Sequence, residues 1–544
     1  MKKIQILLSL LVVLTLALSA CAPAASEPAA ESPAGESAPA EESMPKMGGS
    51  LVWSQAAEPD TLDWHLGWSL NTYVVDAYIS ASLLYLDADK NLIPYLAESY
   101  TVSDDRLVYD FKIRKDVKFH DGTPLTAQDF VWTFERAANP DTASPVAASM
   151  FGPVEKFEAV DDYTLRITVT EEFYPLLFNL ADPGYTGPMS QEAFEKMGAE
   201  AFARAPVGVG PYRVKEWVTG ETITLERNPD YNWGPASFKN RGAYYIETLV
   251  FRTVPEASTV LAGLQAGEIQ FAQLERKDVA SFKSSGDFTV YEQTFKGLNG
   301  FFFNTSKPPF DDVKVRQAVN LAFNRQAMID LALQGMGEPQ FGPLSKPQIG
   351  YWDGVEKIGY GYDLEKAKSL LQEAGYTYNA DGMLEKDGKP FNVIGYVAPD
   401  TEHMVKAMQV AQQQLKELGV DMTIQQEDGG ALFERILGGD YEMTFFGYTA
   451  PEADIMHLVY YSAGGLNMGH VADPELDALL EKARAASDAE SRAASLADVQ
   501  RLIVEKAYVA PLYVTHDFYA LDNRVAGASM HFFDVLNLAD AYFK

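Results

Sequence analysis

Residues 402–426 constrain the fold more than any other stretch of the chain. "EHMVKAMQVAQQQLKELG" (402–419) has the apolar spacing of a helix and ends at Gly419, a residue type that commonly closes helices. "VDMTIQQ" (420–426) follows at once and alternates as a β-strand does. A helix, a glycine stop and a strand in direct succession are typical of a crossover in an α/β sheet. The segment therefore predicts an α/β fold.

Strand-like alternation recurs in the first half of the chain, in "SLVWSQ" (50–55), "RLVYDFKI" (106–113), "TLRITVT" (164–170) and "ETITLERNP" (221–229). The second half is richer in helical patterns. There "VRQAVNLAFNRQAMIDLAL" (315–333) predicts a helix with a buried stripe of Val315, Ala318, Val319, Ala322 and Phe323. The uneven distribution of strands and helices suggests two lobes.

The first 20 residues have the pattern of an export signal. Lys2 and Lys3 supply the positive start, an apolar run covers residues 6–18, and small residues follow. Cys21 is the only cysteine in 544 residues. The segment Leu18-Ser19-Ala20-Cys21 resembles the bacterial lipobox, whose cysteine becomes an acylated N-terminus. We therefore expect residues 1–20 to be a lipoprotein signal peptide and Cys21 to carry a lipid anchor.

After the cysteine, residues 22–47 consist almost entirely of Ala, Pro, Glu, Ser and Gly and contain no aromatic residue. Such a segment cannot bury enough apolar surface to offset chain entropy, so we expect a disordered tether that comprises residues 21–47. Aromatic residues become frequent from Gly48 onward, and the remaining length suffices for two or three core-bearing units. A single cysteine excludes a disulfide framework.

The chain is strongly acidic, with a formal net charge of −32 at pH 7. This charge argues against nucleic acid and anionic lipid headgroups as partners. Nucleophile-elbow, phosphate-loop, dinucleotide and zinc-protease motifs are all missing, and the seven histidines are scattered without an i, i+4 pair. We therefore expect that the protein is not an enzyme and that it binds neither a cofactor nor a metal ion.

A family resemblance appears in "LAESYTVSDDRLVYDFKIRKDVKFHDGTPLTAQDFVWTFER" (96–136). This stretch resembles the signature region of the bacterial extracellular solute-binding proteins of family 5, which includes peptide- and nickel-binding receptors of ABC transporters. Further similar segments follow in the family's order, among them "VGVGPYRVKEWVTGETITLERNPDYNWG", "FFFNTSKPPFDDVKVRQAVNLAFNR" and "YDLEKAKSLLQEAGY". The similarity extends from Gly48 to the C-terminus.

The resemblance implies a two-lobed, periplasmic-binding-protein-like (Venus flytrap) α/β fold with a third subdomain inserted in lobe I. Lobe I would comprise residues 48–297 with the insertion at about 91–205, and lobe II residues 298–508. Residues 509–544 would return to lobe I. A monomer of this kind closes both lobes on a ligand and delivers it to ABC permease subunits with their ATPases. We therefore expect an extracytoplasmic, lipid-anchored receptor of an ABC importer.

In peptide-binding relatives, a tryptophan followed three positions later by an aspartate forms a stacking wall and an ammonium partner. The matching positions here hold Tyr448 and Pro451. Proline cannot pair with an ammonium, so the standard clamp is missing at its usual place. Glu452 or Asp454 could substitute after a small shift of the loop, although Asp454 could equally cap the next helix.

The opposite wall of the site, by the same analogy, comes from "HLGWSLNT" (65–72), where Trp68 and Asn71 are the candidate contacts. Packing for Trp68 and helix capping for Asn71 are the alternative roles. Tyr396, on an expected strand of lobe II, is a further candidate.

A peptide is the first ligand class that we expect, followed by a saccharide or another polar solute and then a nickel complex. Tyr448 could stack on a sugar ring as well as pack a peptide side chain. The alternative to a transport receptor is a peptide-sensing or chaperone-like lipoprotein, or a surface hydrolase, with the same fold.

Overall fold

The largest sheet joins strands from widely separated parts of the sequence. The computed structural model describes residues 45–67, 69–399 and 402–544. The strand order of the sheet is β19 (Asp421–Gln426), β18 (Asn392–Val397), β20 (Met443–Thr449), β13 (Gly297–Phe303), β21 (Val509–Asp522), β11 (Phe271–Leu274), β1 (Ser50–Gln55), β10 (Thr248–Thr253), β9 (Thr222–Arg227) and β8 (Tyr212–Val218). Off this path, β21 also pairs with β12 (Phe288–Thr294) and β14 (Gly337–Pro339).

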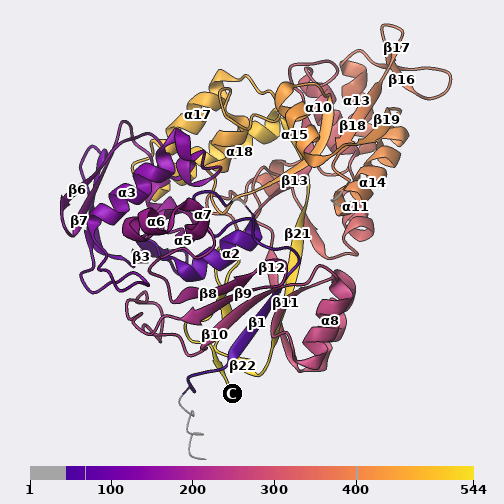
Figure 1. Cartoon of the computed structure of the whole chain (residues 1–544). Coiled ribbons are helices and arrows are strands. Elements are labelled where there is room, and N and C mark those ends of the chain that lie inside the picture. Colours follow the sequence, from indigo (N-terminus) through magenta and orange to yellow (C-terminus); the bar gives the residue numbers. More distant parts are fainter. Residues whose placement is uncertain (1–44, 68, 400–401) are drawn as a thin grey trace, which may run out of the picture. The chain divides into compact units, whose positions relative to one another are not determined.

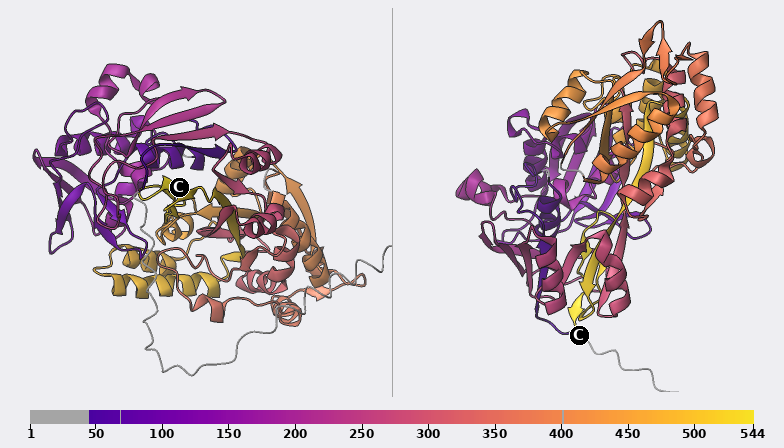
Figure 2. Two further views of the ribbon diagram at one scale, coloured as in Figure 1. Left: turned by 90° about the horizontal axis from the view of Figure 1, so that it is seen from below. Right: turned by 90° about the vertical axis from the view of Figure 1, so that its right-hand side faces the viewer.

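Strand β21 belongs to both halves of this sheet. Its first residues pair with β13, where Ala510 lies opposite Phe301. Its last residues pair with β11 and β12, and Leu521 lies opposite Phe271 of β11. Figures 1 and 2 show this long yellow strand running from the part of the molecule that holds β13 to the part that holds β1 and β11. One continuous strand therefore connects the two halves.

The first half is built on the parallel pair β1 and β10, to which β9 and β8 add antiparallel strands. Trp53 of β1 is buried against Phe251 and Phe271, with ring centroids 5.4 and 4.7 Å away. The alternation in residues 50–55 and 221–229 thus correctly predicts β1 and β9.

A separate four-stranded antiparallel sheet follows within the first half. Its order is β4 (Ala97–Val102), β5 (Val108–Ile113), β7 (Thr164–Val169) and β6 (Val154–Asp161). Helix α3 (Ala127–Ala138) packs on β6 and β7 and starts with a capping box formed by Thr126 and Asp129. Tyr109, Phe111 and Ile113 of β5 are buried, as the alternation predicts.

The second half contains the predicted crossover. Helix α14 (Glu402–Leu418) connects β18 to β19, and these two strands pair in parallel. Gly419 follows the helix with φ +93°, a left-handed conformation that a side chain would disfavour. The prediction of an α/β crossover from residues 402–426 is confirmed.

The stretch 315–333 forms two helices where the sequence pattern predicts one. Helix α10 (Val313–Ala322) ends before Phe323, which is extended, and α11 (Arg325–Ala332) begins after Asn324. The Asn324 side chain accepts a hydrogen bond from the backbone N–H of Ala327 at 3.1 Å. This local N-cap competes with a continuous helix, which explains the break.

The remaining elements cover the two halves. The helices are α2 (Leu70–Ile79), α4 (Leu176–Asn179), α5 (Pro183–Thr186), α6 (Gln191–Met197), α7 (Ala199–Phe202), α8 (Ala257–Ala266), α9 (Val279–Ser285), α12 (Val355–Ile358), α13 (Leu364–Glu373), α15 (Gly429–Gly438), α16 (Ile455–Tyr460), α17 (Pro474–Arg484) and α18 (Ala489–Glu505). Short pairs of strands include β2 (Leu84–Leu86) with β3 (Leu92–Pro94), and β22 (Val525–Ala526) with β25 (Tyr542–Phe543). Within the described ranges, we find no helix with the length and apolar character needed to cross a membrane.

The sequence predicts where the lobes, the signal peptide and the tether begin and end. The predicted lobe limits at 297/298 and 508/509 coincide with the starts of β13 and β21, and the division into lobes at these residues stays a prediction. The signal peptide (1–20), Cys21 and the tether up to residue 44 lie outside the described residues.

Buried histidines make the stability of this fold sensitive to pH. The Nε2 of His531 lies 3.0 Å from the Leu86 carbonyl oxygen, and its Nδ1 lies 3.3 Å from the Phe533 backbone nitrogen. The neutral Nε2–H tautomer satisfies both contacts. Burial, aided by the charge of Lys296, lowers the pKa of His531 to about 4.

We expect His531→Gln to flatten the pH dependence of stability between about pH 6.5 and 4. In this window the unfolded chain binds a proton at position 531 and the folded chain does not, so the wild type loses stability as the pH falls. One such proton corresponds to about 1.4 kcal/mol per pH unit. Urea unfolding at several pH values measures the slope, and an identical slope in the two proteins would contradict the assignment.

Candidate ligand-binding site

A cavity of about 750 Å³ lies among residues of both halves of the sheet. From the first half it is lined by the ends of β1, β10 and β11, the starts of α2 and α8, and residues 516–519 of β21. From the second half it is lined by the end of α11 and by Glu402, His403 and Lys406 of α14. Its volume is within the range of small-molecule sites.

The position of this cavity follows from the sheet topology. Strand β1 is parallel to both β10 and β11, so the carboxyl ends of all three meet at one edge of the sheet. Gln55, Val254 and Leu274 line the cavity from those ends. Ligands of open α/β sheets bind at the carboxyl ends of the strands, so the topology marks this edge as the candidate site.

Most charged groups in the lining have a partner. Lys277 pairs with Glu275, and Lys406 pairs with Glu402 at 2.6 Å. Two further lining residues have partners outside the lining: Asp534 pairs with Lys296 at 2.5 Å, and His516 Nδ1 lies 2.7 Å from Glu292. Such pairs cancel much of each other's charge and leave few groups available to an incoming ion.

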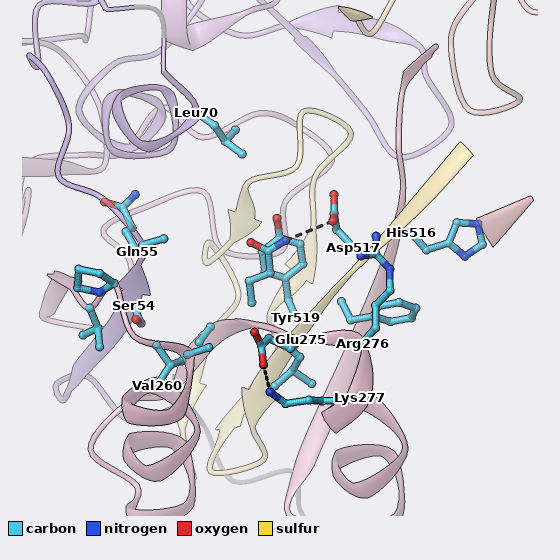
Figure 3. Close-up of a pocket in the computed structure, with 18 of the residues that line it drawn as sticks. Ser54, Gln55, Leu70, Val260, Glu275, Arg276, Lys277, His516, Asp517 and Tyr519 are labelled. Carbon is cyan, nitrogen blue, oxygen red and sulfur yellow. Dashed lines mark hydrogen bonds and ion pairs between the residues drawn. The ribbon is translucent and has the colours of Figure 1, made fainter. Parts of the chain in front are cut away.

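Two charged groups in the lining form no ion pair within the described residues, and these are Arg276 and Asp517. The Nε of Arg276 is buried without a hydrogen-bond partner. Asp517 accepts a hydrogen bond from Gln273 Nε2 at 3.2 Å, and burial raises the pKa of its carboxyl group. Figure 3 shows Ser54 and Gln55 on one side of the cavity and Arg276, Asp517 and His516 on the other.

His403 contributes a neutral polar group from the second half. Its Nδ1 lies 3.0 Å from the Tyr513 hydroxyl oxygen. Burial lowers the pKa of His403 to about 4, and the nearby charge of Arg276 acts in the same direction. The imidazole is therefore uncharged at neutral pH.

Of the residues proposed from the sequence, Asn71 lines this cavity. It lies in the first turn of α2, and its backbone carbonyl accepts a hydrogen bond from Gln55 Nε2 at 3.2 Å. The N-cap of α2 is Ser69, which accepts from the backbone N–H of Thr72. The capping alternative for Asn71 is therefore ruled out. Trp68 lies outside the described residues.

The two proposed tyrosines are buried elsewhere in the second half. The Tyr448 hydroxyl donates a hydrogen bond to the Pro343 carbonyl at 2.5 Å. The ring of Tyr396 lies under the Arg435 guanidinium, 4.8 Å from its centroid. Neither tyrosine is part of the cavity lining, so a ligand contact at either one stays a prediction from the sequence.

Both proposed replacement acids are engaged by arginines. Glu452 forms a buried ion pair with Arg492. Asp454 accepts from Nε and Nη2 of Arg484 at 2.8 and 2.7 Å. These pairs give the loop after Pro451 a structural role, and neither carboxylate lines the cavity. A ligand contact at Glu452 or Asp454 stays a prediction.

We expect Arg492→Met to lower the free energy of unfolding by about 3 to 5 kcal/mol, because it leaves the Glu452 carboxylate buried without a cation. The double variant Glu452→Gln/Arg492→Met removes both charges and is expected to recover most of this loss. Urea unfolding with an unchanged m-value is the measurement. A single variant within 1 kcal/mol of the wild type would show that the pair is not essential.

Sequence reasoning missed Arg276 and Asp517. Arg276 is the second residue after the end of β11, so a correct placement of that strand would have put it near the carboxyl edge. Asp517 and its neighbour His516 interrupt an otherwise buried strand, and charged residues inside an apolar run are a signal in themselves. Their proximity depends on pairing between residues more than 200 positions apart, which periodicity does not reveal.

Metal ligation has no support in the described part of the chain. Residues 45–67, 69–399 and 402–544 contain no group of three or more His, Cys, Asp or Glu side chains that could hold a metal ion.

Comparison with known proteins places the chain in a family. A family model described as bacterial extracellular solute-binding proteins, family 5 Middle, matches residues 91–469. The oligopeptide-binding protein AppA of Bacillus subtilis is 27% identical over 540 residues, which cover 97% of this chain and 96% of that protein. The glutathione-binding protein GsiB of Pectobacterium atrosepticum is 30% identical over 431 residues, covering 77% and 79%.

Solved structures of similar proteins have the same fold as this chain. The structure of Bacillus subtilis AppA in complex with a nonapeptide has a TM-score of 0.76 at 26% identity and covers 92% of this chain and 100% of that one. The ABC transporter substrate-binding protein CtaP from Listeria monocytogenes has a TM-score of 0.79, also at 26% identity, with the same coverage. The expected two-lobed α/β fold is confirmed, and the chain belongs to the bacterial extracellular solute-binding proteins of family 5.

Proposed function

We propose that this protein is the lipid-anchored substrate-binding component of an ABC importer and that it captures peptides in the 750 Å³ cavity. The cavity carries the proposal, because it is lined from both halves of the sheet at the carboxyl ends of parallel strands. A ligand in this place contacts both lobes at once, as a receptor that closes on its ligand requires.

The relatives support a peptide-like ligand. Their names include an oligopeptide-binding, a glutathione-binding and a di/tripeptide-binding protein. Peptides carry amide groups along their length and charges at their ends. The cavity offers matching chemistry, with the side chains of Gln55, Asn71 and Gln273 for amides and those of Arg276 and Asp517 for charges.

Closure would occur by bending where the chain passes between the halves. Strand β21 passes through both halves, and β13 lies beside it in the sheet. Small backbone changes near these strands would swing the start of α14 toward the ends of β1 and β11. The closed form would then be the one that the permease subunits recognise.

Peptide binding is expected to shrink the radius of gyration and to raise the melting temperature. At a ligand concentration of 100 times Kd, stabilisation amounts to about 2.7 kcal/mol. Native mass spectrometry of the freshly purified protein identifies a captured ligand, and small-angle scattering with and without added peptide measures closure. Oligosaccharides serve as the comparison series.

Identical scattering curves with and without a confirmed ligand would contradict closure. Binding of oligosaccharides without binding of any peptide would replace the peptide assignment by the saccharide alternative.

The anchor can be tested separately. We expect Cys21→Ser to leave the protein unprocessed or shed, so that it moves to the aqueous phase of a detergent separation. Acylation requires the thiol, and two or more acyl chains make attachment durable. Ser19→Ala keeps a small residue before the cysteine and is the matched control. If the serine variant stays in the detergent phase, the lipoprotein assignment is wrong.

A further inference from the structure

In the lining of the cavity, the guanidinium of Arg276 and the carboxyl group of Asp517 form no salt bridge with any of the described residues. The lysines of the lining have carboxylate partners, and Asp534 has Lys296. Arg276 and Asp517 line the same cavity but do not approach each other closely enough for an ion pair. Burial raises the pKa of the Asp517 carboxyl group, and the charge of Arg276 offsets part of that rise. The proposal below rests on the proposed function and specifies its ligand class.

Arg276 is positioned to meet an anion. It is the first residue of a short 3₁₀ turn (Arg276–Asp278), which is separated from the end of β11 only by Glu275, so the strand end restricts its position. Its Nε is buried without a hydrogen-bond partner among the described residues, and an unsatisfied buried donor is costly. His403 is neutral and adds no competing charge on the facing helix. A carboxylate in the cavity would satisfy this guanidinium.

Asp517 is positioned to meet a cation. The antiparallel pairing of β11 with β21 brings it beside the residues that follow β11, and Gln273 orients it through a hydrogen bond of 3.2 Å. Burial makes its ionised form expensive, the nearby charge of Arg276 offsets part of that cost, and the neighbouring Asp534 adds repulsion. A ligand ammonium would offset both costs.

The net charge of the whole chain also influences which ligands can approach the cavity. A net charge of −32 repels anions at a distance, whereas a molecule with one positive and one negative group has no net charge and approaches without that penalty. A zwitterion therefore suits both the long-range field and the two unpaired groups in the cavity.

We propose that Arg276 and Asp517 form a dipolar recognition pair, in which Arg276 binds the carboxylate and Asp517 binds the ammonium of one zwitterionic ligand. The ligand class is short peptides with both termini free. The pair takes over the role of the aspartate that proline replaces at position 451, and it does so from the other half of the molecule.

The test is calorimetric titration of the full chain with tri-alanine, N-acetyl-tri-alanine and tri-alanine amide. In the wild type, acetylation and amidation are each expected to weaken binding by more than about tenfold, because each removes a charge-assisted hydrogen bond. Asp517→Asn is expected to abolish the effect of acetylation alone, and Arg276→Gln the effect of amidation alone.

Matched controls are Arg501→Gln and Asp498→Asn, which make the same substitutions in a surface ion pair of α18 away from the cavity. Both are expected to retain the wild-type sensitivity to each modification. Melting curves of all variants establish that they fold.

Wild-type binding that is insensitive to either modification overturns the proposal, and so does sensitivity that persists in the corresponding variant. Peptide binding and closure would stand in both cases, so the proposed function would survive. If tri-alanine fails to bind, the dipolar pair is wrong. If, in addition, no peptide changes the scattering or the melting temperature, the receptor function fails as well.

Discussion

The hydrogen-bonded pairing of β21 with strands of both halves is the constraint on which the rest of the structure depends. Residues 509–513 extend the sheet of the second half beside β13, and residues 516–522 extend that of the first half beside β11 and β12. A strand buried along nearly its whole length cannot leave either sheet without losing its backbone partners. The cavity lies where this strand passes from one half to the other, and His516 to Tyr519 contribute directly to its lining.

The acidic residues in the loop after Pro451 stabilise the structure through ion pairs with arginines. Arg484 and Arg492, which hold Asp454 and Glu452, also lie over the rings of Phe173 and Tyr174 at 5.4 and 4.7 Å. The backbone N–H of Tyr174 donates to the Arg484 carbonyl at 2.9 Å. The carboxylates of this loop therefore stabilise a contact between α17, α18 and a segment from the first half.

Local chemistry explains which features could be predicted from the sequence. The helix that ends at Gly419 depends on residues within a few positions of each other, and it is present as expected. The break at Asn324 is also local, but the apolar periodicity on either side of it conceals the cap. The cavity depends on distant pairing. Arg276 and Asp517 come together only through the register of β11 and β21, so no short-range pattern could place them.

A crystal structure of the protein with its co-purified ligand tests the central claim most directly. We predict ligand density in the 750 Å³ cavity, with a carboxylate within hydrogen-bonding distance of the Arg276 guanidinium and an ammonium at Asp517. We also predict that α14 lies closer to the end of β11 than in the unliganded protein. Ligand density against Tyr448 and the loop at Pro451, with Arg276 and Asp517 left without contacts, would contradict the proposed dipolar pair.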